Sequence, residues 1–423
     1  MTMYSYPKRR LQFFTTSLVG NVLDHYDTAL YGFLAPFIAP HIFQDQDPLI
    51  RLILTYGLLS ISFITRPLGS WFFGKLAFHR SAKEIFASTL LGMAFTTLGM
   101  ALLPSYHTLG AFAAVVLTLL RALQGFFAAG ENTLAPLLML QYTEEKRLSF
   151  TGSIYQSSVV LGILIASCLA TLVSYFPQYP DLWRLPFLLG SSIAVVGWYI
   201  RYNFSAFTGP IFSAVTQDRA REDGRQGSTP QTQLWRWISQ DKRKFLGVVM
   251  ASSFTYLTYS VPFVLFNSFV PLVSNITLSD MLTLNTALLA FDMLLLPVLG
   301  ALADLYDAKK LMCATAFLLA CVLVPFFMYL PSASLLGVTL IRIAIVIPGL
   351  LFLAPLQGWF YKQYTGKEKY MLVGVGYALG SEVFGRSIPA ICLWLWHQTT
   401  WVAAPAIYLA LLCLATALLL TFS

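Results

Sequence analysis

Continuous apolar runs of about twenty residues recur along this 423-residue chain, and they limit its fold more than any other feature. A helix rises 1.5 Å per residue, so such a run is long enough to cross the ~30 Å hydrocarbon core of a bilayer. Within that core every backbone polar group needs a partner inside the protein, which leaves only helices and closed barrels. Barrel strands alternate apolar and polar residues over about ten positions, and these runs do not. We therefore predict an all-α protein that crosses a membrane many times.

The composition agrees with this prediction. Hydrophobic residues make up 57% of the chain and charged residues only 11%, whereas soluble domains carry about 25% charged residues. The five cysteines have neither paired nor metal-ligand spacing and all lie in apolar runs, so we interpret them as small buried hydrophobic residues. We expect no metal and no cofactor.

The apolar runs predict twelve spans in two groups of six. They cover residues 11–42, 49–77, 84–103, 108–140, 148–175, 184–203, 243–272, 279–303, 309–330, 333–361, 370–396 and 399–422. One long polar segment separates the groups, which predicts a six-helix bundle over 1–204, a cytoplasmic linker over 205–242 and a second six-helix bundle over 243–423. Within the linker, Leu234 to Ile238 predict a short amphipathic helix on the membrane surface.

Basic residues are distributed unevenly between the two sides of the predicted membrane. Twelve spans place both termini on one side, and 21 of the 27 lysines and arginines fall there, against only Arg51 and Arg184 on the other. By the positive-inside rule, both termini are cytoplasmic in a bacterial inner membrane. The net charge of +8 is therefore a topology signal, and we expect no nucleic-acid partner.

The two halves share short sequence features in corresponding positions. Arg121 and Arg342 lie in the fourth and tenth predicted spans, and each precedes an Ala-Pro-Leu triplet, at 135–137 and 354–356. The offsets between these features are 221 and 219 residues. Such correspondence is typical of two parallel repeats.

Several longer motifs form one pattern in chain order. They are Gly20-Asn21 with Asp24-His25-Tyr26-Asp27, Arg66-Pro67-Leu68-Gly69, Arg121-Ala122-Leu123-Gln124-Gly125 with Gly130-Glu131, Trp183-Arg184-Leu185-Pro186-Phe187, and Gly376-Tyr377. This pattern resembles the major facilitator superfamily, and within it the metabolite:proton symporters, which include transporters of proline and betaine, citrate, α-ketoglutarate and shikimate. The resemblance implies two pseudo-symmetric six-helix bundles that alternate access to a site lined by the first, fourth, seventh and tenth helices.

The chain departs from the superfamily pattern in the loop after the second span. The superfamily has an acid and a second glycine in this loop, and Gly74 to Lys83 here has neither. The corresponding segment of the second half keeps its acid, Asp304. We therefore expect a weakened latch in the first half and an intact one in the second.

Charged residues inside the predicted spans are candidates for function, because each costs a few kcal/mol at the bilayer centre. The resemblance places Asp24, Asp27 and Glu131 along the solute path. Asp24 and Asp27 share a helical face, and two carboxylates close together cannot both be ionised cheaply. They are candidates for proton coupling, with bracing by Arg66 or Arg121 and direct solute contact as alternatives. His25 is either a proton relay or a packed, hydrogen-bonded side chain.

The remaining candidates concern the solute and structural ion pairs. Arg121 and Arg342 are predicted to clamp a carboxylate from both halves, or else to be neutralised by membrane acids. Further solute-binding candidates are polar or aromatic residues of the presumed cavity helices, namely Tyr31, Tyr256, Tyr259, Asn267 and Gln357. Structural charge pairs are predicted for Arg66, Asp304, Glu382 and Arg386, the last two spaced i, i+4.

These features predict a secondary transporter, in the leading hypothesis a proton-coupled symporter that takes up a small carboxylate-bearing or zwitterionic organic solute. The alternatives are a proton-driven exporter of a small metabolite or metal chelator, and a non-transporting membrane sensor. The sequence has no nucleophile triad, phosphate loop or metal cluster, so we do not expect an enzyme. The expected partners are the solute, protons and lipid, and the expected state is a monomer.

Overall fold

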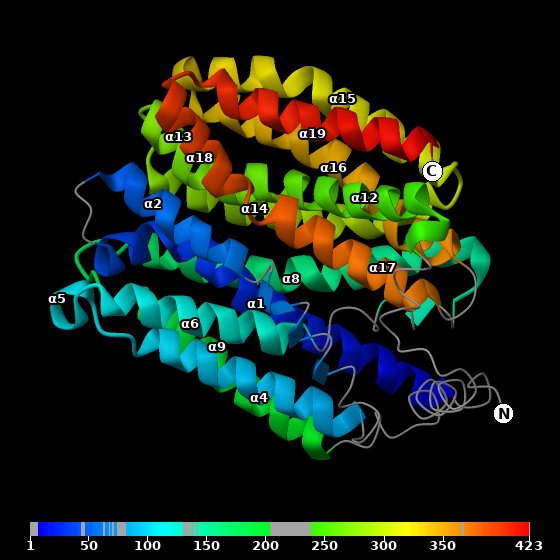
Figure 1. Ribbon diagram of the computed structural model, residues 1–423, viewed down its shortest axis with the longest axis horizontal. Coiled ribbons are helices and arrows are strands. Elements are labelled where there is room, and N and C mark those ends of the chain that lie inside the picture. Colours follow the sequence, from blue (N-terminus) through cyan, green and yellow to red (C-terminus); the bar gives the residue numbers. More distant parts are fainter. Residues whose placement is uncertain are drawn as a thin grey trace.

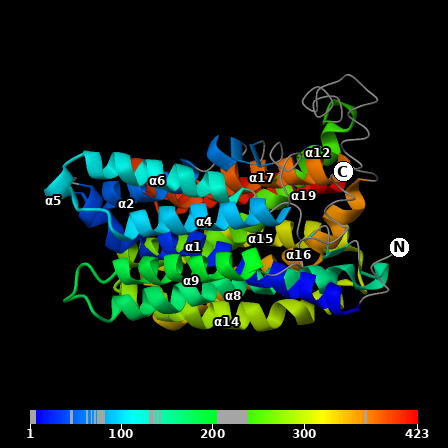
Figure 2. The same cartoon turned by 90° about the horizontal axis from the view of Figure 1, so that it is seen from below.

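The computed structural model describes residues 7–43, 47–61, 64–66, 68–69, 72–73, 82–129, 136, 139–140, 143–203, 238–364 and 368–422. Every regular element in these ranges is helical. The helices run along one long axis in both views (Figures 1 and 2), and α1 (Pro7–Ile42) begins at the end of the molecule where α19 (Ala403–Phe422) finishes. The predicted linker falls largely on residues 204–237, which lie outside the described ranges.

The helices of the first half lie within or close to the predicted spans, and the second of them covers only the start of the span 49–77. They are α1, α2 (Pro48–Gly57), α4 (Ala82–Ala101), α6 (Phe112–Ala128), α8 (Leu148–Ser174) and α9 (Arg184–Asn203). The predicted span 108–140 is wrong at its start, because the short helix α5 (Tyr106–Leu109) ends at Gly110, whose φ of +59° favours glycine and breaks the helix.

The second half contains eight α-helices within the described residues and two local distortions. The helices are α12 (Lys242–Ser260), α13 (Phe266–Val273), α14 (Leu278–Ala303), α15 (Ala308–Tyr329), α16 (Leu335–Gln363), α17 (Glu368–Leu379), α18 (Ile388–Thr399) and α19. π-helical turns join α12 to α13 (η5, Val261–Leu265) and follow α17 (η7, Gly380–Gly385). The latter interrupts the predicted span 370–396.

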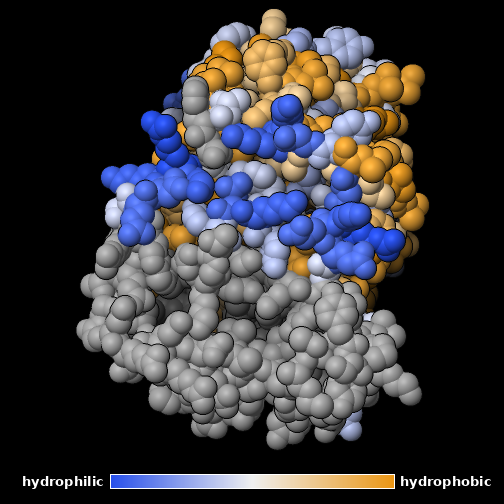
Figure 3. Space-filling model, turned by 90° about the vertical axis from the view of Figure 1, so that its right-hand side faces the viewer, coloured by the Kyte–Doolittle hydropathy of each residue, from blue (hydrophilic) through white to orange (hydrophobic). Residues whose placement is uncertain are grey.

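Six of the described helical stretches are long and apolar enough to cross a membrane by length and composition. Large apolar side chains face outwards, and Leu294, Phe95 and Leu336 are each more than two thirds exposed. In water such exposure is unfavourable, whereas in a bilayer these side chains contact lipid. Figure 3 shows hydrophilic residues gathered across the end of the molecule and hydrophobic residues on its flanks.

Helix α8 lies at the boundary between the two halves and joins them along its length. It packs on α1 in its own half and on α14 and α16 in the other. At one end, Ser167 Oγ and Thr286 Oγ1 lie 2.8 Å apart. At the other end, the Asp304 carboxylate accepts hydrogen bonds from the backbone N–H groups of Ser149 (2.8 Å) and Phe150 (3.1 Å).

The Asp304 contact shows what this acid does in the structure. It lies at the first turn of α8, where unpaired N–H groups and the helix dipole favour a negative charge. The contact therefore fastens the end of α14 to the start of α8. Its counterpart segment in the first half, residues 74–81, lies outside the described residues.

The close approach of α8 to α1 depends on Gly162. A Cβ atom at this position would lie 2.2 Å from the Val22 carbonyl oxygen. We expect Gly162→Ala to destabilise the fold by about 1–3 kcal/mol, because the backbones must separate to make room. Thermal unfolding of the purified chain in detergent measures this.

Gly57→Ala is the matched control, because a Cβ at Gly57 would have nothing within 4 Å. The control is expected to unfold at the wild-type temperature. Equal unfolding temperatures for the two variants would show that the α1–α8 contact does not require glycine.

Candidate functional site

A cavity of about 130 Å³ lies between the two halves. Its wall includes residues from α1 and α8 of the first half, and from α12, η5, α14, α16, α17 and α18 of the second. This space is enough for several water molecules or a small organic solute. Of the four helices that the resemblance implies, the first, seventh and tenth line the cavity, and the described part of the fourth, α6, does not.

Most of the cavity wall is apolar, and a few polar side chains stand out. These are His25, Thr28, Gln156, Thr255, Tyr256, Thr258, Tyr259, Ser260, Asp292, Tyr377 and Arg386. A smaller cavity adjoins it and shares His25, Gln156, Val159, Tyr256 and Tyr377. Its own wall adds Gln357 and Pro136.

The two π-helical turns direct side chains to this cavity. Pro262 has no backbone N–H and therefore removes one hydrogen bond from the helix. The wider turn at this position carries Phe263 and Val264 on the cavity wall. The second turn carries Glu382 and ends just before Arg386. Wider turns of this kind are frequent at functional sites.

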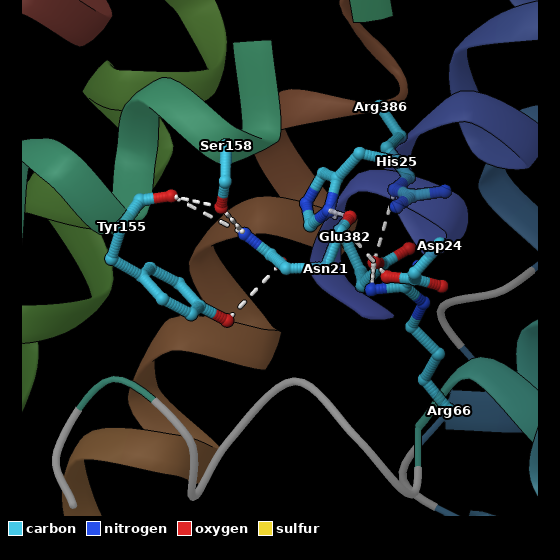
Figure 4. Close-up of polar contacts among 8 residues, drawn as sticks. All are labelled: Asn21, Asp24, His25, Arg66, Tyr155, Ser158, Glu382 and Arg386. Carbon is cyan, nitrogen blue, oxygen red and sulfur yellow. Dashed lines mark hydrogen bonds and ion pairs between the residues drawn. The ribbon is translucent and has the colours of Figure 1, made fainter. Parts of the chain in front are cut away.

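A buried charge cluster joins the two halves beside the cavity (Figure 4). Glu382 Oε1 lies 3.1 Å from Arg66 Nη1 in the first half and 3.0 Å from Arg386 Nε in the second. Asp24 Oδ2 lies 3.7 Å from His25 Nδ1, and the Asp24 charge also acts on Arg386. Two carboxylates thus face two guanidinium groups, and their charges balance. Arg386 belongs both to this cluster and to the cavity wall.

Asp27 faces the interior of the first half instead of the cavity. Its Oδ2 accepts a hydrogen bond of 2.8 Å from Thr97 Oγ1, and Gln124 Nε2 donates to that hydroxyl at 3.2 Å. Arg121 donates to the Gln124 amide oxygen at 2.5 Å and lies 4.3 Å from the centre of the Tyr31 ring. Asp27 and Arg121 are therefore connected through two intervening side chains.

Arg342 occupies the matching position in the second half. It is fully buried and donates hydrogen bonds to Asn285 Oδ1, to the Met281 carbonyl oxygen (3.2 Å) and to Asn267 Oδ1 (3.4 Å). Asn285 in turn donates to Ser167 Oγ on α8 at 3.0 Å. Neither Arg121 nor Arg342 lines the cavity. In the described arrangement they cannot form a two-sided clamp, because each guanidinium is turned into its own half.

The other predicted solute-binding residues lie either on a cavity wall or in the interior of one half. Tyr256 and Tyr259 line the main cavity and Gln357 the smaller one. Tyr31 and Asn267 belong to the interior networks of Arg121 and Arg342.

Glu131 lies outside the described residues. Sequence reasoning gave no role to Gln156, Asp292 or Tyr377, which the cavity wall includes. The sequence does contain a signal for Asp292, because it is an acid within an apolar run.

Comparisons with known proteins agree with this architecture. The family described as sugar (and other) transporters matches residues 13–204. A Staphylococcus aureus (strain COL) protein assigned as a proline/betaine transporter is 28% identical over 412 residues, covering 96% of this chain and 86% of the relative. The proline/betaine transporter of Escherichia coli (strain K12) is 25% identical over 418 residues, covering 93% of this chain and 79% of the relative.

A crystal structure of a D-xylose–proton symporter superposes with a TM-score of 0.72 at 12% identity, covering 96% of both chains. The xylose transporter XylE from E. coli, in a partially occluded inward-open conformation, gives 0.72 at 14% identity, covering 97% of this chain and 96% of that one. At this identity the likeness shows the fold. The predicted twelve-helix, two-bundle fold class is thereby confirmed, and the relatives are transporters rather than enzymes.

The charge cluster predicts a strong dependence on Glu382. Glu382→Gln would leave Arg66 and Arg386 close together and without their shared carboxylate, so we expect a loss of about 3–5 kcal/mol in stability. In an Arg66→Gln background the same substitution should cost less, by about 0.5–3 kcal/mol. Unfolding of the single and double variants in detergent measures this coupling.

Glu144→Gln serves as the control, because Glu144 is exposed in the connection before α8. It is expected to leave stability within about 0.5 kcal/mol of wild type. If the Glu382 and Arg66 effects were simply additive, the ion pair would not join the halves.

Proposed function

We propose that this chain is a secondary transporter of the major facilitator superfamily, similar to the metabolite:proton symporters, and that it takes up a small organic solute together with protons. The observation that carries the proposal is the cavity between the halves, whose wall combines His25, Asp292 and Arg386 with apolar surface. Such a site suits a small solute with charged groups and an apolar body.

Contacts between the halves on both sides of the cavity support alternating access. Asp304 fastens the halves at the first turn of α8, and the Tyr56 hydroxyl lies 2.6 Å from Ser268 Oγ on the far side. We propose that residues 1–204 and 243–423 move as two bundles, joined by the 205–242 linker. Breaking either set of contacts would open the site to one side at a time.

Asp27 is the proposed proton carrier. Its side chain is 3% exposed, its Oδ1 has no hydrogen-bond partner among the described residues, and Oδ2 has the Thr97 hydroxyl rather than a guanidinium. A carboxylate without a direct cationic partner binds and releases a proton more readily than one held in an ion pair. Asp24 and Glu131 are the further candidates for this pathway.

The solute is proposed to carry a carboxylate. Arg386 supplies the guanidinium on the cavity wall, with His25 on the same wall. The sequence relatives are named for proline and betaine, and both of these molecules have a carboxylate. Arg386 therefore takes the role that the sequence suggested for Arg121 and Arg342.

Solute uptake into proteoliposomes tests the proposal. The purified chain would be given an inward proton gradient and radiolabelled glycine betaine, proline, α-ketoglutarate or citrate, and a dye would report proton entry. The expected result is accumulation of at least one solute that stops when the gradient is collapsed. Accumulation of none, or accumulation without proton entry, would contradict symport.

Asp27→Asn is expected to abolish uphill accumulation while retaining exchange of labelled for unlabelled solute, because the amide resembles a permanently protonated acid. The measurement uses whichever solute the wild type accumulates, with and without the gradient. Asp181→Asn is the control, because Asp181 is an exposed acid outside the bundle. Gradient-driven accumulation at the wild-type level would remove Asp27 from coupling.

The proposed orientation places both termini in the cytoplasm of a bacterial cell. In a background with the five native cysteines replaced by alanine, Glu145→Cys is expected to react with an impermeant thiol reagent only after the membrane is opened. Tyr179→Cys, at an exposed position on the opposite side, is expected to react in intact cells. The reverse pattern would invert the topology.

A further inference from the structure

Asp292 is an acid on the cavity wall that no described side chain compensates. It lies on α14, is 6% exposed, and its Oδ1 has no hydrogen-bond partner among the described residues. In the part of the chain that the structure describes, no lysine, arginine or histidine lies within ion-pair distance of it. A buried ionised carboxylate is costly without a positive partner.

The other charged groups near the cavity have partners within the protein. Arg386 faces Glu382 at 3.0 Å, and Glu382 also faces Arg66 at 3.1 Å. His25 lies 3.7 Å from Asp24. The cavity is therefore left with one uncompensated negative position, at Asp292, and the missing positive charge is free to come from a solute.

Aromatic rings line the same cavity. Tyr259 and Phe263 lie with ring centres 5.8 Å apart, and Tyr256 and Tyr377 with ring centres 6.1 Å apart. Asp292 and Tyr259 are both part of the wall of this cavity. Ring faces attract ammonium groups and especially quaternary ones, because the faces carry negative charge density.

We propose that Asp292 and this aromatic wall bind the ammonium group of a zwitterionic solute, while Arg386 and His25 receive its carboxylate. The proposal rests on the transport function proposed above and narrows it to one solute class. A zwitterion supplies the one positive charge that the cavity lacks, whereas a di- or tricarboxylate supplies none and adds negative charges beside Asp292. Asp292 is thus the residue that determines specificity for the cationic group.

The test uses two probes of the same shape. Glycine betaine has a positively charged nitrogen at its branched centre. 3,3-Dimethylbutanoate has a neutral carbon at that position and is otherwise the same. Binding of both to the purified full chain would be measured by calorimetry. The wild type is expected to bind glycine betaine at least tenfold more tightly than 3,3-dimethylbutanoate.

Asp292→Asn is expected to weaken glycine betaine binding about ten- to a hundredfold and to leave 3,3-dimethylbutanoate within about twofold of the wild type. Asp292→Glu keeps the charge and is expected to keep the preference for the ammonium probe. Asp280→Asn is the matched control, because Asp280 is an exposed acid at the start of the same helix.

Several results would overturn the proposal. One is a folded Asp292→Asn protein that binds glycine betaine as tightly as the wild type does. Another is an Asp292→Asn protein whose affinity falls equally for both probes. Wild-type protein that binds the two probes equally would overturn it without any variant. Proton-driven uptake of citrate or α-ketoglutarate but not of glycine betaine or proline would leave the transport function intact and refute the zwitterion site.

Discussion

A charge buried in a membrane protein is energetically costly, and this cost governs how the charged side chains in the interior of the molecule are arranged. Ionised groups at the bilayer centre cost a few kcal/mol even on the mildest scales. The negative charge of Glu382 is compensated by two ion pairs, one with Arg66 across the boundary between the halves and one with Arg386 within its own half. The same ion pairs that make the charges tolerable therefore also hold the two halves together.

Each half also contains a buried arginine whose terminal guanidinium nitrogens donate hydrogen bonds within that half, while its Nε has no partner among the described residues. Arg121 reaches Gln124 and the Tyr31 ring, and Arg342 reaches two asparagines and a backbone carbonyl. Hydrogen bonds from neutral amides stabilise a guanidinium without cancelling its charge. These networks give each half a polar interior of its own.

Arg386 connects the cavity to the contact between the halves. This residue lies on the cavity wall and is also a member of the Glu382 cluster. A solute carboxylate bound to it would compete with Glu382 for this guanidinium, and that competition would change the cluster that joins the halves. Binding and movement would then be coupled by a shared charge, in line with the principle that a ligand shifts an equilibrium only through differential contacts.

The sequence by itself determined the fold class, because apolar runs of bilayer length permit only helices and the two sets of repeats imply two bundles. It also identified the charged residues, since each stands out in an apolar run. Only the tertiary structure decided which of them reach the cavity. The rotation of α6 and α16 directs Arg121 and Arg342 into their own halves, and that of α14 places Asp292 on the cavity wall. Arg386 reaches the same wall just after the π-helical turn over Gly380–Gly385. Spacing along the chain does not reveal such rotation, because it depends on how neighbouring helices pack.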